Sequence, residues 1–412
     1  MNYIKHYSKE IHIYFLPVVA FFLLISTAVS NIFTILVVLS VFFQIYKRKD
    51  YKVIFEKNIL IYSILIFLLM AFSSFYSVAE TSELLYTMKK YAKFLLIPIF
   101  YYYLKVNNNA ELVIKYFISS CTIILFLSYA KYFNLFDFNY FYYIFNFVST
   151  EPIRLNIVDD KAIIFQSYIN HGTILSTFFL LSLLLGYKKN SKIYYLLALM
   201  TFINILFLAD SRSAYLITII FLLLFTIKTL NNKFLFIISF FIIISIFFTA
   251  INSNFVKRIE VASNDILKIL DKNDIDSSIG YRYFWANVGF DVISKKPILG
   301  NGVGSFQNSV KDYYKENDHF KYIPDLVGKN PHNEFISIAS QLGLLGLILF
   351  ILFLRSLYKT NRYFIFSNAV FITVFFSCLS NSVFYDNILG IFIIILICIS
   401  SQDKSIKFFE AK

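Results

Sequence analysis

Long runs of apolar residues constrain this chain more than any other feature of its sequence. A helix needs about 20 apolar residues, within a range of roughly 17–25, to cross the hydrocarbon core of a bilayer. The runs are continuous and lack the alternation of apolar and polar residues that barrel strands require. Only 15% of the residues are charged, whereas soluble domains carry about 25%. The sequence therefore predicts an all-α polytopic membrane protein.

We predict about 12 transmembrane helices, several of them short enough to be tilted, broken or extended by flanking residues. The predicted spans are Ile11–Ala28, Ile32–Tyr46, Ile59–Phe75, Tyr91–Leu104, Leu112–Phe133, Ala162–Leu185, Ile193–Leu208, Ser211–Ile227, Phe234–Ala250, Asn333–Leu354, Tyr363–Leu379 and Val383–Ile399.

One long polar stretch, Asn252–Asn330, interrupts these runs. Structureless loops beyond about 15 residues are uncommon, and the spacing of its apolar residues predicts three helices. Their expected faces are Val256, Ile259, Ile266, Leu267 and Leu270, then Ile279, Arg282, Trp285, Ala286 and Gly289, then Phe306, Val310 and Tyr314 behind a Ser305 cap. We therefore divide the chain into helices 1–9 at 1–251, a helical loop at 252–331, and helices 10–12 with a tail at 332–412.

The net charge of +13 is distributed as in a membrane protein. The long loop holds 11 Lys/Arg and 10 Asp/Glu, so it contributes only one of these charges. Among the other connecting segments, one side carries 19 Lys/Arg and the other carries six. Basic residues concentrate on the cytoplasmic side, so both termini are expected there and the long loop on the opposite side. This pattern does not indicate a nucleic-acid partner.

Metal and disulfide chemistry have little support in the sequence. Cys121, Cys378 and Cys398 each lie inside an apolar run without metal-ligand spacing, which predicts buried free thiols. Asp159, Asp160 and Asp210 do not form an acidic cluster beside a histidine, so we expect no metal site.

Two arginines are candidates for anion binding. Arg212 lies between two apolar spans, where a charged residue is costly and often functional. Pairing with Asp210, or extension of its side chain to the interface, explains it equally well. Arg282 lies one helical turn before Trp285, and its fixed donors suit a phosphate or diphosphate. Trp285 can stack on a sugar or a guanidinium, although an ordinary amphipathic surface helix has the same pattern.

The segment after these arginines contains a glycine-rich turn and a histidine. No strand precedes Gly300–Gly304, so the dinucleotide-binding interpretation fails, and a flexible turn that re-enters the membrane surface is favoured. The backbone donors of such a turn can still contact a phosphate. Asn330 is expected to cap a membrane helix with Pro331 at its first position, which places His332 in the first turn. The helix dipole disfavours imidazolium there, and a neutral imidazole is a competent general base. The alternative is a polar residue that merely ends the loop.

Together these residues resemble the O-antigen ligase family of bacterial inner-membrane proteins, including its polymerase-like relatives. The resemblance covers roughly Asp210–Phe350. It is carried, in order, by Ser211-Arg212-Ser213-Ala214, Arg282 with Trp285, Pro297-Ile298-Leu299-Gly300-Asn301-Gly302-Val303-Gly304-Ser305-Phe306, His332-Asn333-Glu334-Phe335 and Gly343-Leu344-Leu345-Gly346.

The resemblance implies transfer of a glycan from undecaprenyl diphosphate to a sugar hydroxyl of the lipid A core, on the periplasmic face of the inner membrane, in lipopolysaccharide biosynthesis. It implies that Arg212 and Arg282 hold the diphosphate, that His332 activates the acceptor hydroxyl, and that neither metal nor nucleotide cofactor is needed. Further substrate contacts are expected from Trp285, Gly302, Gly304, Asn333 and His171. Gln341 departs from the family, which often has glutamate there.

Three other functions remain open from the sequence. A repeat-unit polymerase shares the chemistry but transfers the glycan to another lipid-linked glycan, and a protein O-oligosaccharyltransferase transfers it to Ser or Thr. A flippase or transporter is the non-enzyme alternative, which predicts internal repeats or paired ionisable residues at mid-membrane. We find no convincing repeat.

Overall fold

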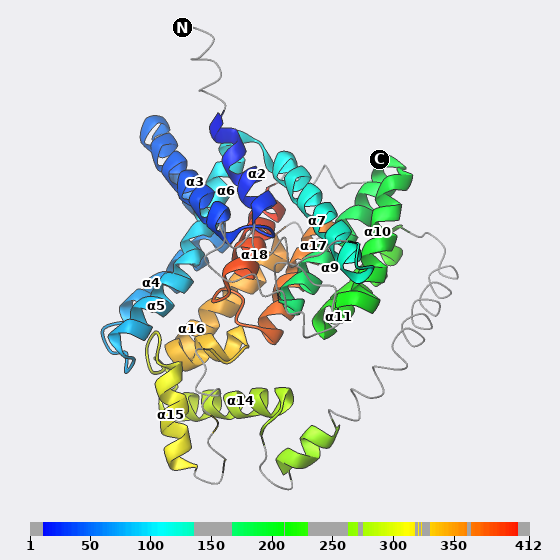
Figure 1. Cartoon of the computed structure of the whole chain (residues 1–412). Coiled ribbons are helices and arrows are strands. Elements are labelled where there is room, and N and C mark those ends of the chain that lie inside the picture. The colour runs from blue at the N-terminus through cyan, green and yellow to red at the C-terminus, as the bar shows by residue number, and fades with distance from the viewer. Residues whose placement is uncertain are drawn as a thin grey trace.

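The computed structural model of the chain describes residues 11–135, 167–209, 211–229, 263–270, 275–317, 320, 323, 330–360 and 364–402. Within these ranges the regular structure is helical and contains no strand (Figure 1). The predicted all-α class is therefore confirmed for the part of the chain that is described.

Most helices form one bundle. Its members are α2 (Phe15–Phe22), α3 (Thr27–Arg48), α4 (Asn58–Ser73), α6 (Leu96–Asn107), α7 (Ala110–Tyr132), α9 (Tyr168–Lys189), α10 (Lys192–Asn204), α11 (Arg212–Thr229), α16 (Glu334–Lys359), α17 (Ile365–Ser380) and α18 (Asn387–Ser400). Short 3-10 helices at Ile11–Tyr14, Tyr51–Phe55 and Ala92–Leu95 and a π-helical turn at Ile205–Ala209 adjoin them. Three further helices are α5 (Thr81–Tyr91), α14 (Ser278–Lys295) and α15 (Phe306–Glu316).

The predicted spans within the described residues all contain helices. Four helices, α3, α7, α9 and α16, are long and apolar enough to cross a membrane, and the other apolar helices are shorter. A helical membrane protein is therefore shown, whereas the number of spans stays a prediction. The expected span Phe234–Ala250 lies outside the described residues. The sequence analysis missed α5, an amphipathic helix with Glu83, Lys89 and Lys90 on it.

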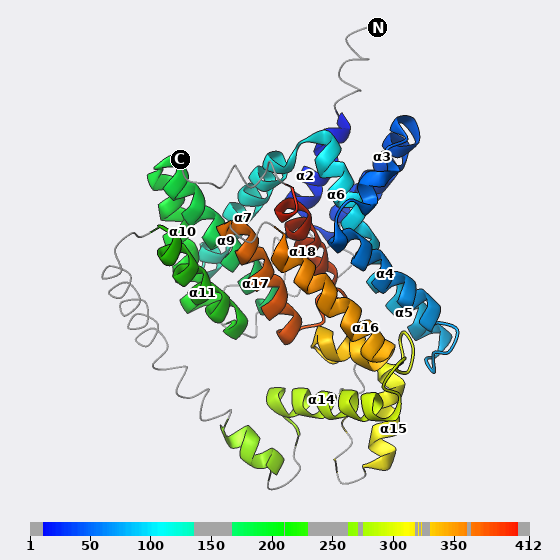
Figure 2. The ribbon, with the colours of Figure 1, turned by 180° about the vertical axis from the view of Figure 1, so that it is seen from behind.

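The bundle has two distinct ends. At one end, which we call the terminal end, Lys57 donates to the carbonyl of Ser401 at 2.6 Å, and Asn109 donates to the carbonyl of Ile13 at 2.6 Å. The first and the last described segments of the chain therefore both lie at this end. At the opposite end, the loop end, α14 runs across the bundle beside α15 (Figures 1 and 2). This arrangement agrees with termini on one side of the membrane and the long loop on the other, and which side is cytoplasmic stays a prediction.

Helix α18 forms the centre of the bundle. Its residues from Leu389 to Ser400 are all buried, as expected for a helix that is apolar on every face. It packs against α6, α9 and α17. Beside it, the rings of Phe94 and Phe384 stack with centroids 4.3 Å apart, and Phe353 meets both edge-on.

Helix α16 is broken near the loop end. Gly343 has φ 64° and ψ −161°, a conformation that essentially only glycine adopts. A break within a membrane helix frees backbone groups that must find partners inside the protein. The break is therefore possible only because another segment supplies those partners.

The glycine-rich turn after α14 supplies them. The amide of Leu344 donates to the carbonyl of Pro297 at 2.7 Å. In return, the amides of Asn301 and Gly302 donate to the carbonyls of Ser340 and Gln341 at 3.0 and 2.9 Å. The turn is thus bonded to α16 on both sides of the break.

The packing at this junction leaves no room for larger residues. A Cβ on Gly302, where φ is 86°, would lie 2.4 Å from the Cα of Ser77, and one on Gly343 would lie 2.3 Å from the carbonyl oxygen of Ile298. Two of the glycines in the sequence pattern are therefore required for close backbone approach.

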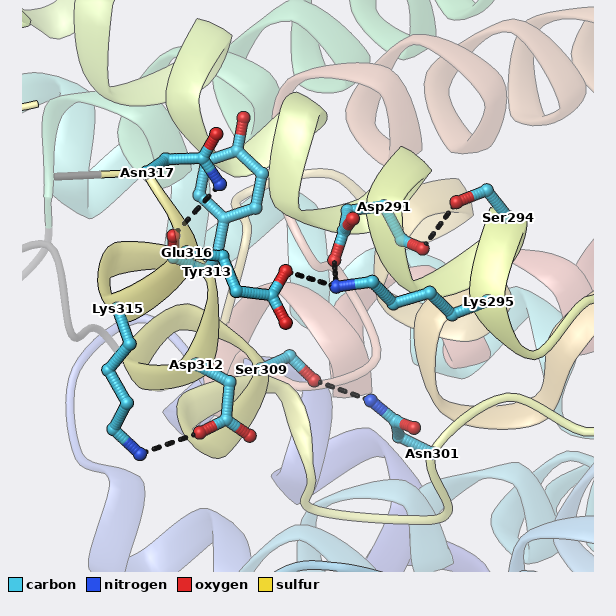
Figure 3. Close-up of polar contacts among 10 residues, drawn as sticks. All are labelled: Asp291, Ser294, Lys295, Asn301, Ser309, Asp312, Tyr313, Lys315, Glu316 and Asn317. Atoms are coloured by element: carbon cyan, nitrogen blue, oxygen red, sulfur yellow. Dashed lines mark hydrogen bonds and ion pairs between the residues drawn. The ribbon is translucent and has the colours of Figure 1, made fainter. Parts of the chain in front are cut away.

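Helices α14 and α15 share a small core of their own, built around Phe284, Trp285, Val288, Phe306, Val310 and Tyr314. Lys295 on α14 forms ion pairs with Asp291, at 2.9 Å, and with Glu316 on α15, while Asn301 donates to Ser309 at 2.9 Å (Figure 3). Two of the three predicted loop helices are confirmed, with the expected residues of α15 facing inward.

Two details of the loop differ from the prediction. Ser305 makes no side-chain cap, because its hydroxyl donates instead to the carbonyl of Gly302 at 2.6 Å. Residues 263–270 are helical, but Ile266, Leu267 and Leu270 are exposed rather than packed. Val256 and Ile259 lie outside the described residues.

Replacing Gly343 tests the importance of the break. We expect Gly343→Ala to be destabilised by the positive φ and by the clash with Ile298, with backbone strain alone costing about 1–3 kcal/mol. Thermal unfolding of the purified protein in detergent should show a clearly lower midpoint. Gly186→Ala is the matched control, because that glycine is helical and the nearest atoms to an added Cβ belong to the side-chain ring of Tyr195, at 3.0 Å. Equal midpoints for the two variants would contradict a strained, docked break.

Candidate functional site

His332 lies just before α16 rather than inside its first turn. The helix begins at Glu334, and its cap is Asn333, whose side-chain oxygen accepts from the amide of Ile336 at 3.1 Å. The predicted Asn330 cap was wrong, because the side chain of Asn330 instead accepts from the amide of His332 at 3.0 Å. This local turn holds His332 at φ 49°, a left-handed conformation in which histidine is enriched.

Two further elements contact the His332 ring. Trp285 of α14 lies against it, with ring centroids 5.2 Å apart and planes at 37°. On the bundle side, Nδ1 is 3.2 Å from the side-chain oxygen of Asn381, the residue that follows α17. The histidine is therefore held between the long loop and the bundle.

Arg282 lies on the same helix as Trp285, one turn earlier, and its side chain is exposed. Partial burial lowers the pKa of His332 below its usual value, and the positive charge of Arg282 lowers it further. The hydrogen bond with Asn381 and the charge of Asp386 oppose this shift without cancelling it. At neutral pH the imidazole is therefore uncharged.

Arg212 begins α11 at the loop end. Helix α11 packs against α17, and its start lies beside Gly172 of α9, whose neighbour Asn170 lies 3.5 Å from Asp386 in the turn that follows α17. Ser211, the preceding residue, packs against Gly172 on α9. The backbone of Arg212 thus has the expected location, and its side chain lies outside the described structure.

His171 belongs to a different environment. It is buried in the bundle, where Nε2 lies 3.2 Å from the side-chain oxygen of Asn204. The amide nitrogen of Asn204 donates in turn to Ser128 at 2.7 Å. This chain of contacts joins α9, α10 and α7 rather than the His332 site. No contact between His171 and His332 is found among the described residues, and a substrate contact by His171 stays a prediction.

The groups of the glycine-rich turn and of Asn333 that were expected to contact substrate form hydrogen bonds within the protein. The amide of Gly302 bonds to the backbone of α16, and the amide of Gly304 donates to the side-chain oxygen of Gln341 at 2.7 Å. Asn333 caps α16 and also donates to the carbonyl of Leu379 at 3.1 Å. These residues join the loop and α17 to α16, and Gln341, where the family often has glutamate, takes part in the same junction.

Sequence reasoning missed three polar residues beside the site. Glu334 is fully buried and accepts from the amide of Phe384 at 2.9 Å. Lys93 is 7% exposed and donates to the carbonyls of Tyr385, at 3.4 Å, and of Asp386. Asn381 is the third. An ionisable residue inside an apolar run is a signal for function, and Lys93 and Glu334 both carried that signal in the predicted spans.

A comparison with protein families matches this part of the chain. The model described as O-antigen ligase covers residues 195–351, which include Arg212, Arg282, Trp285, His332 and the break at Gly343. This domain belongs to the O-antigen ligase family. Members of this family are glycosyltransferase-like ligases and polymerases, which supports an enzyme in general. A comparison with curated proteins gave no match.

The residues matched by the family model do not include the whole site. Asn381 and Lys93 lie outside the matched residues, on parts of the bundle that precede and follow the ligase domain. Within the described ranges, His, Cys, Asp and Glu side chains do not gather in threes as in a metal site.

The single tryptophan offers a direct measurement of the site. Imidazolium quenches indole fluorescence more strongly than neutral imidazole, because it accepts an electron from the excited ring. Since Trp285 lies against His332, we expect its emission to fall as the pH drops through the His332 pKa, with a midpoint below the ordinary histidine value. His332→Gln should remove this transition. A transition that persists in that variant would show that another group is responsible.

Proposed function

We propose that the protein is an O-antigen ligase-like glycosyltransferase. It moves a glycan from undecaprenyl diphosphate to a sugar hydroxyl of the lipid A core, in lipopolysaccharide biosynthesis. The reaction takes place at the periplasmic face of the bacterial inner membrane, where the loop end of the bundle lies, with both termini in the cytoplasm. It uses neither metal nor nucleotide.

One observation carries this proposal. The packing of α14 against α16 brings the ring centroids of Trp285 and His332 to 5.2 Å, and Arg282 lies one turn before Trp285 on the same helix. An uncharged base beside a permanent cation suits a reaction in which a hydroxyl loses a proton while a diphosphate accumulates charge.

The surroundings of the site also favour an anion. Helices α9, α11, α16 and α18 all begin at the loop end, as shown by contacts between their first turns and caps. Asn170 on α9, for example, lies 3.5 Å from Asp386, the cap of α18. The positive ends of these helix dipoles therefore lie at the end of the bundle where the diphosphate is proposed to bind.

The proposed reaction is a single displacement. His332 takes the proton of the acceptor hydroxyl, and the hydroxyl oxygen forms a bond to the anomeric carbon of the glycan. The bond between that carbon and the diphosphate oxygen breaks, and the electron pair leaves with undecaprenyl diphosphate. Arg282 and Arg212 stabilise the added negative charge through fixed two-point hydrogen bonds, and Trp285 provides a surface for a sugar ring.

The identity of the acceptor separates this proposal from its alternatives. A repeat-unit polymerase would use the same site but yield longer lipid-linked glycans, and a protein O-oligosaccharyltransferase would yield glycopeptides. Purified protein supplied with lipid-linked donor and each acceptor in turn distinguishes them. Glycan on the lipid A core supports the ligase, and a product with only one of the other acceptors contradicts it.

Substitution of His332 tests the base. General-base catalysis contributes about 10²–10⁴-fold, so His332→Ala should lose transfer by that order while still binding the donor. His332→Gln, which forms hydrogen bonds but takes no proton at neutral pH, should be nearly as inactive. The kcat/KM of the wild-type protein should fall as the pH drops through the His332 pKa. Near-normal transfer by His332→Gln would show that the histidine only positions the acceptor.

Substitution of the arginines tests the diphosphate site. Loss of one preorganised donor costs about 10²–10³ in rate, so Arg282→Ala and Arg212→Ala should each fall by that order at unchanged protein levels. Lysine keeps the charge but not the planar fork, so both Arg→Lys variants should remain defective. Lys315→Ala is the control, because Lys315 is an exposed cation of the same loop that pairs only with Asp312 among the described residues. If Arg282→Ala matches this control, Arg282 does not bind the diphosphate.

A further inference from the structure

The contact between His332 and Asn381 determines which nitrogen carries the proton. The side-chain oxygen of Asn381 accepts from the amide of Ser382 at 2.9 Å, which fixes that atom as the oxygen of the side-chain amide. The same oxygen lies 3.2 Å from Nδ1 of His332. An amide oxygen can only accept a hydrogen bond. Nδ1 must therefore be the donor and carry the hydrogen.

A neutral imidazole has only one ring hydrogen. With that hydrogen on Nδ1, Nε2 carries the free lone pair. Among the residues that the structure describes, Nε2 of His332 has no hydrogen-bond partner. The atom able to accept a proton is thus also the atom left open for a substrate.

We propose that Asn381 is a positioning residue, which holds His332 in the tautomer with hydrogen on Nδ1, and that the buried Glu334 and Lys93 fix the turn that carries Asn381. The inference rests on the proposed role of His332 as the base and adds the groups that orient it. Asn381 contacts neither substrate nor reacting atoms and acts only through the histidine.

The turn in question is residues 381–386, between α17 and α18. Glu334 accepts from the amide of Phe384 at 2.9 Å, in the middle of the turn. Lys93 reaches its end, where it donates to the carbonyls of Tyr385 and Asp386. These two side chains come from α16 and from the 3-10 helix before α6, so the turn is held from two sides.

Burial of these charges has a cost that packing alone does not require. Glu334 is 0% and Lys93 7% exposed. Burying an ionisable side chain is costly unless it is hydrogen-bonded, and each of these two bonds to the backbone of the turn that begins at Asn381, so their position calls for a reason other than packing. Accurate placement of the turn is such a reason, because its first residue touches the His332 ring and a small displacement would break the bond to Nδ1.

Asn381→Asp tests the contact without relying on activity. A carboxylate beside Nδ1 stabilises imidazolium, and an opposite charge at this distance shifts a pKa by about 1–3 units. The pH midpoint of Trp285 fluorescence should therefore rise by that amount. The other charged groups that act on His332 are Arg282 from α14 and Asp386 from the turn, and both are unchanged in this variant. Asn317→Asp, at the end of α15, is the matched control and should leave the midpoint in place.

Transfer kinetics test the positioning role. In Asn381→Asp the acidic limb of the kcat/KM profile should move to higher pH together with the fluorescence midpoint. In Asn381→Ala the tautomer is no longer fixed, so kcat should fall by about 10–100-fold, as for other partners that orient a histidine, with the KM for the donor unchanged. Glu334→Gln keeps an acceptor for Phe384 and should retain most activity, whereas Glu334→Ala should behave like Asn381→Ala.

The outcomes separate this inference from the proposed function. If the fluorescence midpoint in Asn381→Asp equals that of the Asn317→Asp control, the contact with Nδ1 is absent and the inference is overturned. If the midpoint moves but Asn381→Ala transfers glycan at the wild-type kcat, the contact exists and its positioning role is overturned. If His332→Gln transfers glycan normally, His332 is not the general base. The proposed function then loses its base, and the catalytic role of Asn381 is contradicted as well.

Discussion

The break in α16 at Gly343 is the constraint on which the rest of the structure depends. A membrane helix can open its backbone only where other protein groups replace the lost hydrogen bonds. Here the glycine-rich turn does so through its own backbone, with Gly302 against α4–α5 and Asn301 and Gly302 bonded to the helix. The turn thereby anchors α14 and α15 to the bundle, and α14 delivers Trp285 and Arg282 to His332. The break thus adds a backbone junction to the side-chain contacts of α14 with the start of α16, such as Gly289 against Ile336 and Trp285 against His332.

The electrostatics of the site follow from the same arrangement. The histidine is uncharged at neutral pH chiefly because burial of its ring lowers its pKa, and the Arg282 cation adds to this shift. That cation is also the group proposed to hold the diphosphate. The cluster of Glu334 and Lys93 lies on the other side, inside the bundle, where it orders the turn next to the histidine.

The sequence predicted much of this and failed at definable points. Continuous apolar runs predicted the bundle because each buried or lipid-facing helix must be apolar along its length. The 3/4 spacing found α14 and α15, but it could not show that Gly300–Gly304 docks on α16 rather than on a ligand. The run Asn330-Pro331-His332 resembled a helix start with Asn330 as its cap, whereas the structure has Asn333 as the cap. Both are asparagines three residues apart, and a local sequence pattern cannot decide between them.

The residues that surround the histidine could not be predicted from local sequence patterns, for a different reason. Asn381 and Lys93 come from segments 49 and 239 residues away from His332, and only packing brings them to it. A single polar residue in an apolar run signals that it has a partner without saying which one. The tautomer of His332 likewise depends on the amide of Ser382, a backbone group that the sequence cannot place.

A structure of the protein with a lipid-diphosphate-linked glycan bound tests the central claim most directly. The account predicts that the diphosphate lies against Arg282 at the loop end, and that Nε2 of His332 points to the space beside the anomeric carbon, within about 2.6–3.2 Å of an acceptor hydroxyl when one is present. A diphosphate bound away from Arg282, or an anomeric carbon out of reach of His332, would contradict the account.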